Sequence, residues 1–360
     1  MSYLFIGDPH FKIDNAIETI QFINNIETLL QSRKDEIDYI ILLGDILHTH
    51  EKLHTFALNS ALRFFKMLTK YKPVYCLVGN HDATSNTIFL TDEHWLNVLK
   101  EWNNITIVDT PIILKSKEKR MILCPYVPDG RFVEALETIK NEIDFKKADV
   151  IVGHQLLDGA KMGPIVANGI ERWQVDWPLC VSGHIHDKQR PQSNLYYVGS
   201  SMQHAFGESA DKTVYLYNIH ISTGEEIDLQ LNKKEIIYIN IEDIDHLAEK
   251  IEKKNGSQVK IVIKGDAADC KAAKKSNIVK QLSKLENVKN IQFKEHRVES
   301  TNESIKELKT INNISKSDDI PFELLVRYKI AERNDPYLTS LAEHLLVGGE
   351  DLSDKDVLIL

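Results

Sequence analysis

The chain has 360 residues, of which 42% are hydrophobic and 27% charged, and its formal net charge is −9. This length exceeds one ordinary hydrophobic core and predicts two or three domains, while the composition is typical of a soluble globular protein. No apolar run reaches the roughly 20 residues that span a bilayer, and the first residues lack the basic start of a signal peptide, so we expect neither a membrane partner nor secretion.

Cysteine spacing argues against some kinds of structural site, and the charge distribution identifies one basic segment. The four cysteines are far apart and form no C-x-x-C pair, which argues against a zinc ribbon or a disulfide framework and predicts a reducing compartment. Residues 233–297 carry 15 basic and 10 acidic side chains, whereas the segments on either side are acidic. This basic segment is either a solvated lysine-rich surface or a face that contacts phosphate groups, and the sequence leaves both interpretations open.

Short β-rich runs alternate with helical patterns through the first 232 residues. Apolar residues at helical spacing predict one helix over 17–30 and another over 56–68. This alternation predicts a layered α/β fold, in which ligands bind at the carboxyl ends of the strands. The expected strands cover residues 3–7, 39–44, 73–79, 120–126, 148–153, 179–183, 195–199 and 213–221.

The pattern restarts after residue 232. We expect a small α/β domain over 233–297, a polar linker over 298–320 and a C-terminal helical segment over 321–360. Within that last segment Pro336 separates two apolar helical runs, which predicts a helical hairpin. Its apolar stripe either binds a partner or folds back on the rest of the chain. The small domain's expected strands cover 235–241, 258–265 and 288–296, and its expected helices cover 243–254 and 271–286.

In five places a predicted strand reaches a glycine that is followed at once by Asp, Asn or His. Any one such residue is most often an ordinary turn residue, but five in register in one sheet would converge at its edge. The set holds carboxylate, amide and imidazole groups without a thiolate, which suits manganese, iron or zinc. Seven donors exceed one tetrahedral site, so they predict two divalent cations that share a carboxylate. The candidate metal ligands are Asp8, His10, Asp45, Asn80, His154, His184 and His186.

These blocks resemble, in order, those of the calcineurin-like metallophosphoesterases. The matching motifs are Asp8-x-His10, Gly44-Asp45, Gly79-Asn80-His81-Asp82, Gly153-His154 and Gly183-His184-x-His186. The resemblance implies a four-layer β-sandwich flanked by helices over residues 1–232, two metal ions bridged by Asp45, and His81 beside the phosphate. The implied ligands of one ion are Asp8, His10, Asp45 and His186, and those of the other are Asp45, Asn80, His154 and His184.

One branch of this superfamily is resembled more closely than the others. The Gly-Asp-x-x-Asp-Arg-Gly motif of the protein phosphatases is absent, and His48 stands three residues after Asp45. With the segments 153–163 and 197–208, this resembles the SbcD-type nuclease subunit of double-strand-break repair complexes. The resemblance implies a DNA endo/exonuclease that hydrolyses phosphodiester bonds at DNA ends. Its catalytic residues would be His48 and His81, and its two metal ions would be manganese, with iron, zinc or magnesium as alternatives.

The same resemblance implies a setting for the protein. The C-terminal segment would bind an SMC-like coiled-coil ATPase, residues 233–297 would cap the nuclease domain, and the chain would form a homodimer. Its location would be cytoplasmic or nucleoid-associated, in a cellular, phage or viral system. Two alternatives stay open: a phosphatase or phosphodiesterase acting on a small molecule or phosphoprotein, and a scaffold without activity.

Three further residues near the motifs have weaker interpretations. His50 and His54 match no family position and are expected to face solvent. Asp82 follows His81 and either fixes the tautomer of an imidazole or serves only to form a turn.

Overall fold

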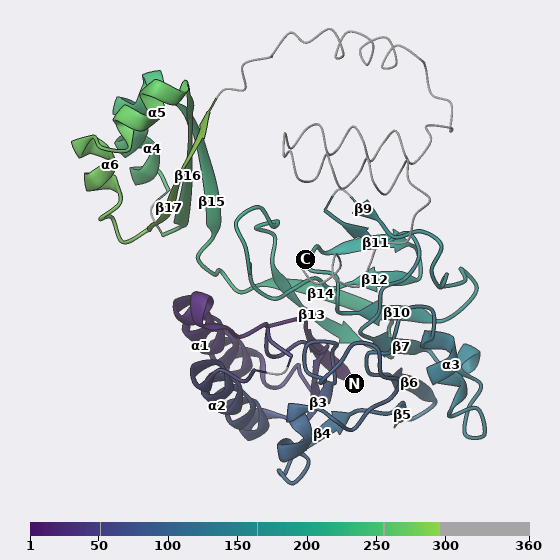
Figure 1. Cartoon of the computed structure of the whole chain (residues 1–360). Coiled ribbons are helices and arrows are strands. Elements are labelled where there is room, and N and C mark those ends of the chain that lie inside the picture. Colours follow the sequence, from purple (N-terminus) through teal and green to yellow (C-terminus); the bar gives the residue numbers. More distant parts are fainter. Residues whose placement is uncertain (51, 164, 255, 296–360) are drawn as a thin grey trace, which may run out of the picture. The chain divides into compact units, whose positions relative to one another are not determined.

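The computed structural model describes residues 1–50, 52–163, 165–254 and 256–295. The expected linker over 298–320 and the expected helical segment over 321–360 lie outside these residues. Within them, most strands of residues 1–232 form two six-stranded sheets (Figure 1). No helix in the described ranges is both long enough and apolar enough to cross a membrane.

Each sheet contains four adjacent parallel strands. In the first sheet two antiparallel strands extend one side of this group, and in the second sheet one antiparallel strand lies at each edge. Strands buried on both faces read as nearly continuous apolar runs, which is why their sequences are so uniform. The first sheet has the order β14 (Thr223–Asp228), β13 (Thr213–Asn218), β1 (Ser2–Ile6), β2 (Tyr39–Leu42), β3 (Val74–Leu77) and β4 (Ile105–Val108). The second has the order β11 (Gln189–Gln192), β12 (Leu195–Tyr197), β10 (Leu179–Ser182), β7 (Val150–Gly153), β6 (Lys119–Leu123) and β5 (Ile112–Ser116).

Helices cover the outer faces of both sheets, with α1 and α2 beside the first and α3 beside the second (Figure 1). The α-helices are α1 (Ala16–Arg33), α2 (Thr55–Tyr71) and α3 (Phe132–Glu137), and the 3-10 helices are η1 (Ile13–Asn15), η2 (Trp95–Leu99) and η3 (Phe145–Lys147). A short hairpin pairs β8 (Lys161–Met162) with β9 (Ile165–Val166). The result is a mixed α/β fold of several sheets, as the sequence predicts.

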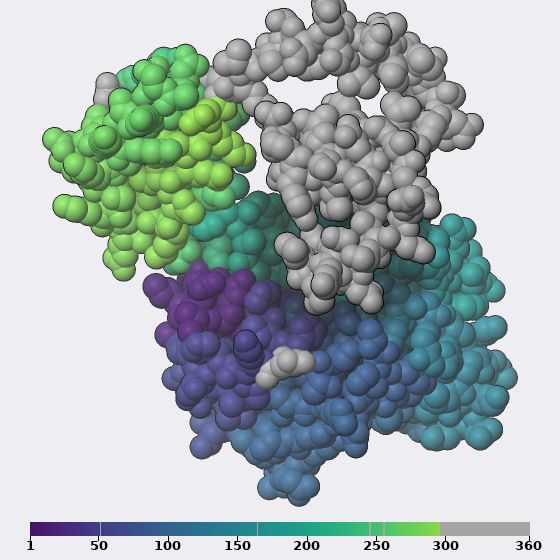
Figure 2. All heavy atoms as spheres, viewed as in Figure 1, coloured from purple at the N-terminus to yellow at the C-terminus, as the bar shows by residue number. Residues whose placement is uncertain are grey.

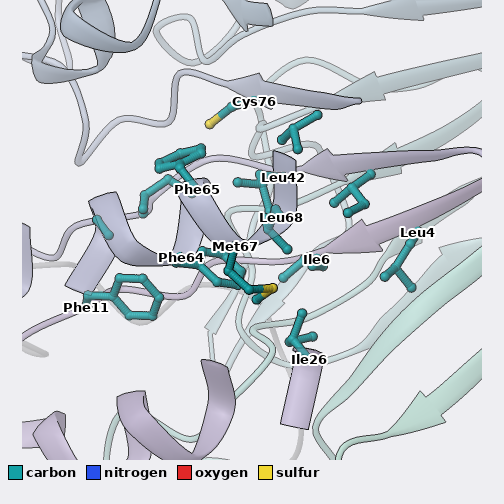
Figure 3. Close-up of a cluster of buried hydrophobic side chains, with 14 of the residues drawn as sticks. Leu4, Ile6, Phe11, Ile26, Leu42, Phe64, Phe65, Met67, Leu68 and Cys76 are labelled. Atoms are coloured by element: carbon teal, nitrogen blue, oxygen red, sulfur yellow. The ribbon is translucent and has the colours of Figure 1, made fainter. Parts of the chain in front are cut away.

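Three apolar clusters hold these layers together. Because successive side chains of a strand point to opposite faces, Leu4 and Ile6 of β1 pack under α1 and α2, whereas Tyr3 and Phe5 pack between the sheets. Figure 3 shows the first cluster, where side chains of α2 meet those of β1 and β2. The third cluster lies between the second sheet and α3, around the buried Trp173. In the space-filling view, the purple and blue residues pack directly against the teal ones (Figure 2).

The eight strands expected before residue 232 are all present, but six others lack a predicted counterpart: β4, β5, β8, β9, β11 and β14. The expected apolar face of α1 is partly wrong, because Ile17 and Ile20 are 58% and 49% exposed. The buried face is formed by Phe22, Ile26 and neighbours, and at 100° per residue Ile17 lies on the opposite side of the helix from Ile26.

After residue 232 a parallel three-stranded sheet carries its own apolar core. Two details differ from the expectation: the helix expected over 243–254 begins as a 3-10 helix, and the single helix expected over 271–286 is two. The second of these begins because the Ser276 side chain accepts a hydrogen bond from the Val279 backbone. The elements are β15 (Lys234–Asn240), η4 (Ile241–His246), α4 (Leu247–Glu252), β16 (Gln258–Gly265), α5 (Ala267–Ala273), α6 (Asn277–Leu282) and β17 (Val288–Glu295).

Candidate metal centre

The seven candidate ligands converge at one place, although not in the way the sequence predicts. The expectation of a single sheet is wrong, because β1, β2 and β3 belong to the first sheet while β7 and β10 belong to the second. The carboxyl ends of these strands nevertheless meet, since the loops that follow them bond across the two sheets. The His184 backbone N–H donates to Asp8 Oδ2 at 2.8 Å, and His154 Nδ1 donates to the Leu43 carbonyl at 2.7 Å.

Glycines bring the backbone close to the ligands. A Cβ atom at Gly79 would lie 2.2 Å from Asp45 Oδ1, and one at Gly183 would lie 2.6 Å from Asp8 Oδ1. Neither distance is compatible with a side chain, so these two glycines leave room for the carboxylates of the opposite loops.

The backbone at the centre is strained. Asp8, His10, Asp45 and His184 have φ values of 35°, 42°, 52° and 77°, in the left-handed region that non-glycine residues seldom adopt. Such strain costs of order 1–3 kcal/mol per residue and persists where the surroundings enforce it, typically at functional sites. Four strained residues in one cluster therefore indicate that the backbone conformation is unfavourable here and is held by the surrounding structure, which keeps these side chains together.

One group of donors surrounds Asp8, His10 and His186. The Nε2 atoms of His10 and His186 face each other at 3.0 Å, and His10 Nε2 lies 3.3 Å from Asp45 Oδ2. Asp8 Oδ1 is fully buried and has no hydrogen-bond partner among the residues that the structure describes. Two facing imidazole nitrogens and an unpartnered carboxylate oxygen fit a divalent cation, which would satisfy all three.

A second group of donors lies beside the first. Asn80 Oδ1 is 3.0 Å from His154 Nε2 and 2.9 Å from His184 Nδ1. Asp45 Oδ2 is 3.3 Å from His154 Nε2 and equally far from His10 Nε2, so the same oxygen faces both groups. These residues also fit a divalent cation, and Asp45 is the side chain that could serve both positions.

The charges of the cluster balance one another only in part. Burial raises the pKa of Asp8 above its ordinary value. Burial opposes protonation of His154, but the carboxylates of Asp45 and Asp8 outweigh it and raise the pKa of His154 to about 9. Burial, together with the charge of His154, lowers the pKa of His184 to about 3. The two buried carboxylates thus attract positive charge to the centre, and a divalent cation would meet the same attraction.

Comparison with known proteins agrees with this geometry. Residues 1–188 match the family model described as calcineurin-like phosphoesterase. The chain belongs to the calcineurin-like phosphoesterase family. "Putative phosphoesterase 078R" of Invertebrate iridescent virus 3 is 38% identical over 351 residues and covers 97% of each chain. "Putative phosphoesterase 244L" of Invertebrate iridescent virus 6 is 43% identical over 280 residues, which is 77% of this chain and 98% of that one.

Similar solved structures are more distant. A hypothetical protein from Thermus thermophilus is 15% identical, with a TM-score of 0.35, and covers 63% of this chain and 100% of its own. Yfce, a phosphoesterase from E. coli, is 12% identical, with a TM-score of 0.30, and covers 64% of this chain and 100% of its own. Family membership therefore carries the functional conclusion: the chain is a phosphoester hydrolase of a family that binds divalent metal ions.

The two candidate catalytic histidines of this phosphoesterase border the cluster. His81 is held at both ends, since its backbone N–H donates to Asp45 Oδ1 at 2.8 Å and its Nδ1 donates to the His48 carbonyl at 2.7 Å. His48 is half-buried, and its Nδ1 lies 3.4 Å from His10 Nδ1. Both rings therefore lie beside the metal ligands while keeping contact with solvent.

His50 and His54 differ from each other. The expectation that His50 faces solvent is wrong, because its ring stacks on that of His81 with centroids 4.5 Å apart and planes 21° apart. His54 is exposed at the start of α2, as the sequence predicts.

Asp82 acts on the backbone rather than on an imidazole. Its carboxylate accepts hydrogen bonds from the Ile46 N–H at 3.1 Å, the Gly79 N–H at 3.1 Å and the Trp95 indole N–H at 2.9 Å. These contacts support the structural interpretation of Asp82 rather than the fixing of an imidazole tautomer. The carboxylate joins three segments, those of Ile46, Gly79 and Trp95, behind the metal centre.

Sequence reasoning misses three residues that contact the ligands. His204 Nε2 donates to the Asp8 carbonyl at 2.9 Å, Glu208 Oε1 lies 3.3 Å from His186 Nδ1, and Lys212 Nζ donates to the His186 carbonyl at 2.8 Å. His204 and Glu208 lie in segment 197–208, one of the segments that resemble the nuclease family. The sequence pattern identifies the ligands as residues that follow a glycine at the end of a strand. Neither His204 nor Glu208 follows such a glycine, so this pattern does not identify them.

Proposed function

We propose that this phosphoesterase is a metal-dependent DNA endo/exonuclease that hydrolyses phosphodiester bonds at DNA ends. The observation that supports it most is His48. His48 occupies the position at which the Gly-Asp-x-x-Asp-Arg-Gly motif of the protein phosphatases has its second Asp. Its Nδ1 is 3.4 Å from His10 Nδ1. A second histidine beside the ligands, in addition to His81, supplies a proton-transfer group for an alkoxide leaving group such as the sugar oxygen of DNA.

The roles of the chain's own residues follow from their contacts. The two divalent cations would be held by Asp8, His10, Asp45, Asn80, His154, His184 and His186. Bound cations supply a nucleophile at neutral pH and neutralise charge on the phosphate. His81 is oriented by the His48 carbonyl and Asp45, so its Nε2 is directed away from those bonds and can contact a phosphate oxygen. His48 is partly exposed and can exchange a proton with the leaving group and then with solvent.

The alternative function is hydrolysis of a small phosphoester or a phosphoprotein. This alternative would use the same metal ligands as the nuclease. Unlike the nuclease, it requires neither a second histidine at position 48 nor a basic segment after residue 232. A scaffold without activity is disfavoured because the seven donors lie together: Asp8, His10 and His186 form one compact group and Asp45, His154 and His184 another. Asn80 Oδ1 lies within 3.0 Å of a nitrogen of both His154 and His184.

A direct comparison of substrates tests the proposal. The full chain, loaded with Mn²⁺, is assayed on linear duplex DNA, on p-nitrophenyl phosphate and on a phosphopeptide, with Mg²⁺, Zn²⁺ and Fe²⁺ as alternative metals. We expect Mn²⁺-dependent shortening of linear DNA, and we expect His184→Ala to lose both bound metal and activity. Turnover of the small phosphoester or phosphopeptide without any cleavage of DNA would establish the alternative instead.

The proposed partners extend this function. We propose that the nuclease works with an SMC-like coiled-coil ATPase bound through residues 321–360, that it forms a homodimer, that residues 233–297 cap the nuclease domain, and that it acts in the cytoplasm or at the nucleoid. Co-purification of the full chain with a candidate ATPase, compared with a chain truncated after residue 300, tests the first of these. The two relatives named above are viral proteins, which supports the expectation of a virus-encoded system.

A further inference from the structure

The segment that follows β12 places a carboxylate behind one metal ligand. His186 turns its Nε2 toward His10, at 3.0 Å, and its Nδ1 toward Glu208 Oε1, at 3.3 Å. In a neutral imidazole only one nitrogen carries a proton. A proton on Nδ1, donated to Glu208, leaves the lone pair of Nε2 directed into the donor group.

Glu208 is itself held in place. Its Oε2 accepts the His204 backbone N–H at 2.9 Å and lies 3.4 Å from Lys212 Nζ. The Lys212 side chain is only 5% exposed, and its Nζ also donates to the His186 carbonyl at 2.8 Å. Glu208 and Lys212 therefore restrain the same histidine from two directions, one at the ring and one at the backbone.

Other candidate ligands are supported differently. The Nδ1 atom of His154 donates to a neutral backbone carbonyl, that of Leu43, at 2.7 Å. Among the ligand histidines in the described ranges, only His186 has a carboxylate within hydrogen-bond distance of the ring nitrogen that points away from the cluster. A carboxylate partner fixes the tautomer, orients the ring and makes the ligating nitrogen more basic than a carbonyl partner does.

We propose that Glu208 is the positioning residue of His186 and sets the affinity of one of the two metal positions, the one formed by Asp8, His10 and His186. This inference rests on the proposed metal centre and not on the identity of the substrate. Loss of such a partner typically weakens metal binding by about 10–100-fold. The effect should be selective, because Glu208 contacts no ligand of the position formed by Asn80, His154 and His184.

Metal titration of three purified full-length variants tests this inference. Mn²⁺ binding to the wild type, Glu208→Gln and Glu208→Ala is followed by calorimetry and by the loss of the free Mn²⁺ electron paramagnetic resonance signal. We expect two ions per wild-type chain. In the variants we expect one position to weaken by about 10–100-fold, more in Glu208→Ala than in Glu208→Gln, which keeps an acceptor oxygen, while the other position stays within about threefold.

Controls separate positioning from folding. Glu225→Gln removes a surface carboxylate that pairs with Arg33 and contacts no ligand, so both positions should bind as in the wild type. Thermal unfolding without metal shows whether each variant folds, and Glu208→Gln decides the question if Glu208→Ala does not. Unchanged binding of both ions in a folded Glu208→Gln overturns the inference, as does equal weakening of both positions. A wild type that binds no Mn²⁺ overturns the metal centre and this inference with it, whereas a wild type that binds two ions without cleaving DNA overturns only the nuclease proposal.

Discussion

At Gly79, a single methyl group would change the chemistry of the centre. Its added Cβ would lie 2.2 Å from Asp45 Oδ1 and 2.3 Å from the Asp45 backbone nitrogen, so either Asp45 or the backbone must move. We expect Gly79→Ala to destabilise the fold by about 1–3 kcal/mol and to weaken Mn²⁺ binding at both positions, because Asp45 faces both. Denaturant unfolding and Mn²⁺ titration measure the two effects. Gly130→Ala is the control: its Cβ would meet no atom within 4 Å, but the φ of 79° is strained for alanine, so it should cost stability and keep full metal binding.

His48 is expected to transfer a proton rather than to bind a metal ion. We expect His48→Ala to keep both metal ions and to lose about 10²–10⁴-fold in turnover on DNA, which is the typical contribution of a general acid or base. His54→Ala is the matched control, since it removes an exposed histidine six residues further on. Steady-state turnover with metal content measured on the same samples checks both. Turnover of His48→Ala within about threefold of the wild type would show that His48 is a structural loop residue, and would weaken the nuclease proposal.

Among the elements, the first residue of β15 joins segments that are distant in the sequence. Lys234 Nζ donates to Asn15 Oδ1 at 2.6 Å and lies 3.3 Å from Glu18 Oε1, while its backbone N–H donates to Gln203 Oε1 at 2.7 Å. The start of α1, the segment that carries His204 and Glu208, and the start of β15 therefore meet at one buried lysine. Because Gln203 lies directly before His204, this junction also supports the region behind the metal ligands.

Removing the Lys234 ammonium should be costly. Lys234→Met leaves the Glu18 carboxylate, whose side chain is 7% exposed, without its positive partner. We expect a loss of about 3–5 kcal/mol in the free energy of unfolding, the usual consequence of breaking one half of a buried ion pair. Urea unfolding measures it, with Lys233→Met, the exposed neighbour, as the control that should change little. Equal stability of the two variants would mean that Glu18 finds another partner.

For the whole molecule, the metal centre should act as a clamp between the two sheets. Its ligands come from β1, β2 and β3 on one side and from β7 and β10 on the other, so bound cations should stabilise the folded chain by mass action. At a free Mn²⁺ concentration 100 times the dissociation constant, the gain is about 2.7 kcal/mol, which corresponds to a rise of roughly 5–10 °C in Tm. Calorimetric melting in EDTA and in Mn²⁺ checks this, and identical Tm values would contradict a centre that binds cations.

The basic segment gives a second prediction at this scale. Lys271, Lys274 and Lys275 are exposed on and after α5. If this surface contacts DNA, reversing all three to Glu should weaken duplex binding, and each lost phosphate contact should remove about 0.9 from the slope of log affinity against log salt. Binding isotherms at several salt concentrations measure the slope. The control variant makes the same charge change in the acidic part of the chain, at the exposed Lys34, Lys66 and Lys70. If the two variants lose the same affinity for DNA, the effect comes from net charge and not from a DNA contact of the basic segment.

The sequence by itself determined the features that depend on short-range order. Each strand before residue 232 that it predicts is present, because buried parallel strands are short apolar runs that need no knowledge of their neighbours. The strand-end glycines followed by Asp, Asn or His identify the family for the same reason, since the motif and its turn lie within a few residues.

Only the tertiary structure decided which surfaces meet. Two sheets, rather than one, bring the strand ends together, and β14 is a strand because it pairs with β13, although its own residues are mostly exposed. The inward face of α1 depends on the sheet beneath it, and so Ile17 is exposed while Ile26 is buried. Glu208 contacts His186 although the two residues are 22 positions apart in the chain. Periodicity and propensity record what each segment can bury or bond, whereas the partner is set by packing between segments far apart in the chain, which no local pattern encodes.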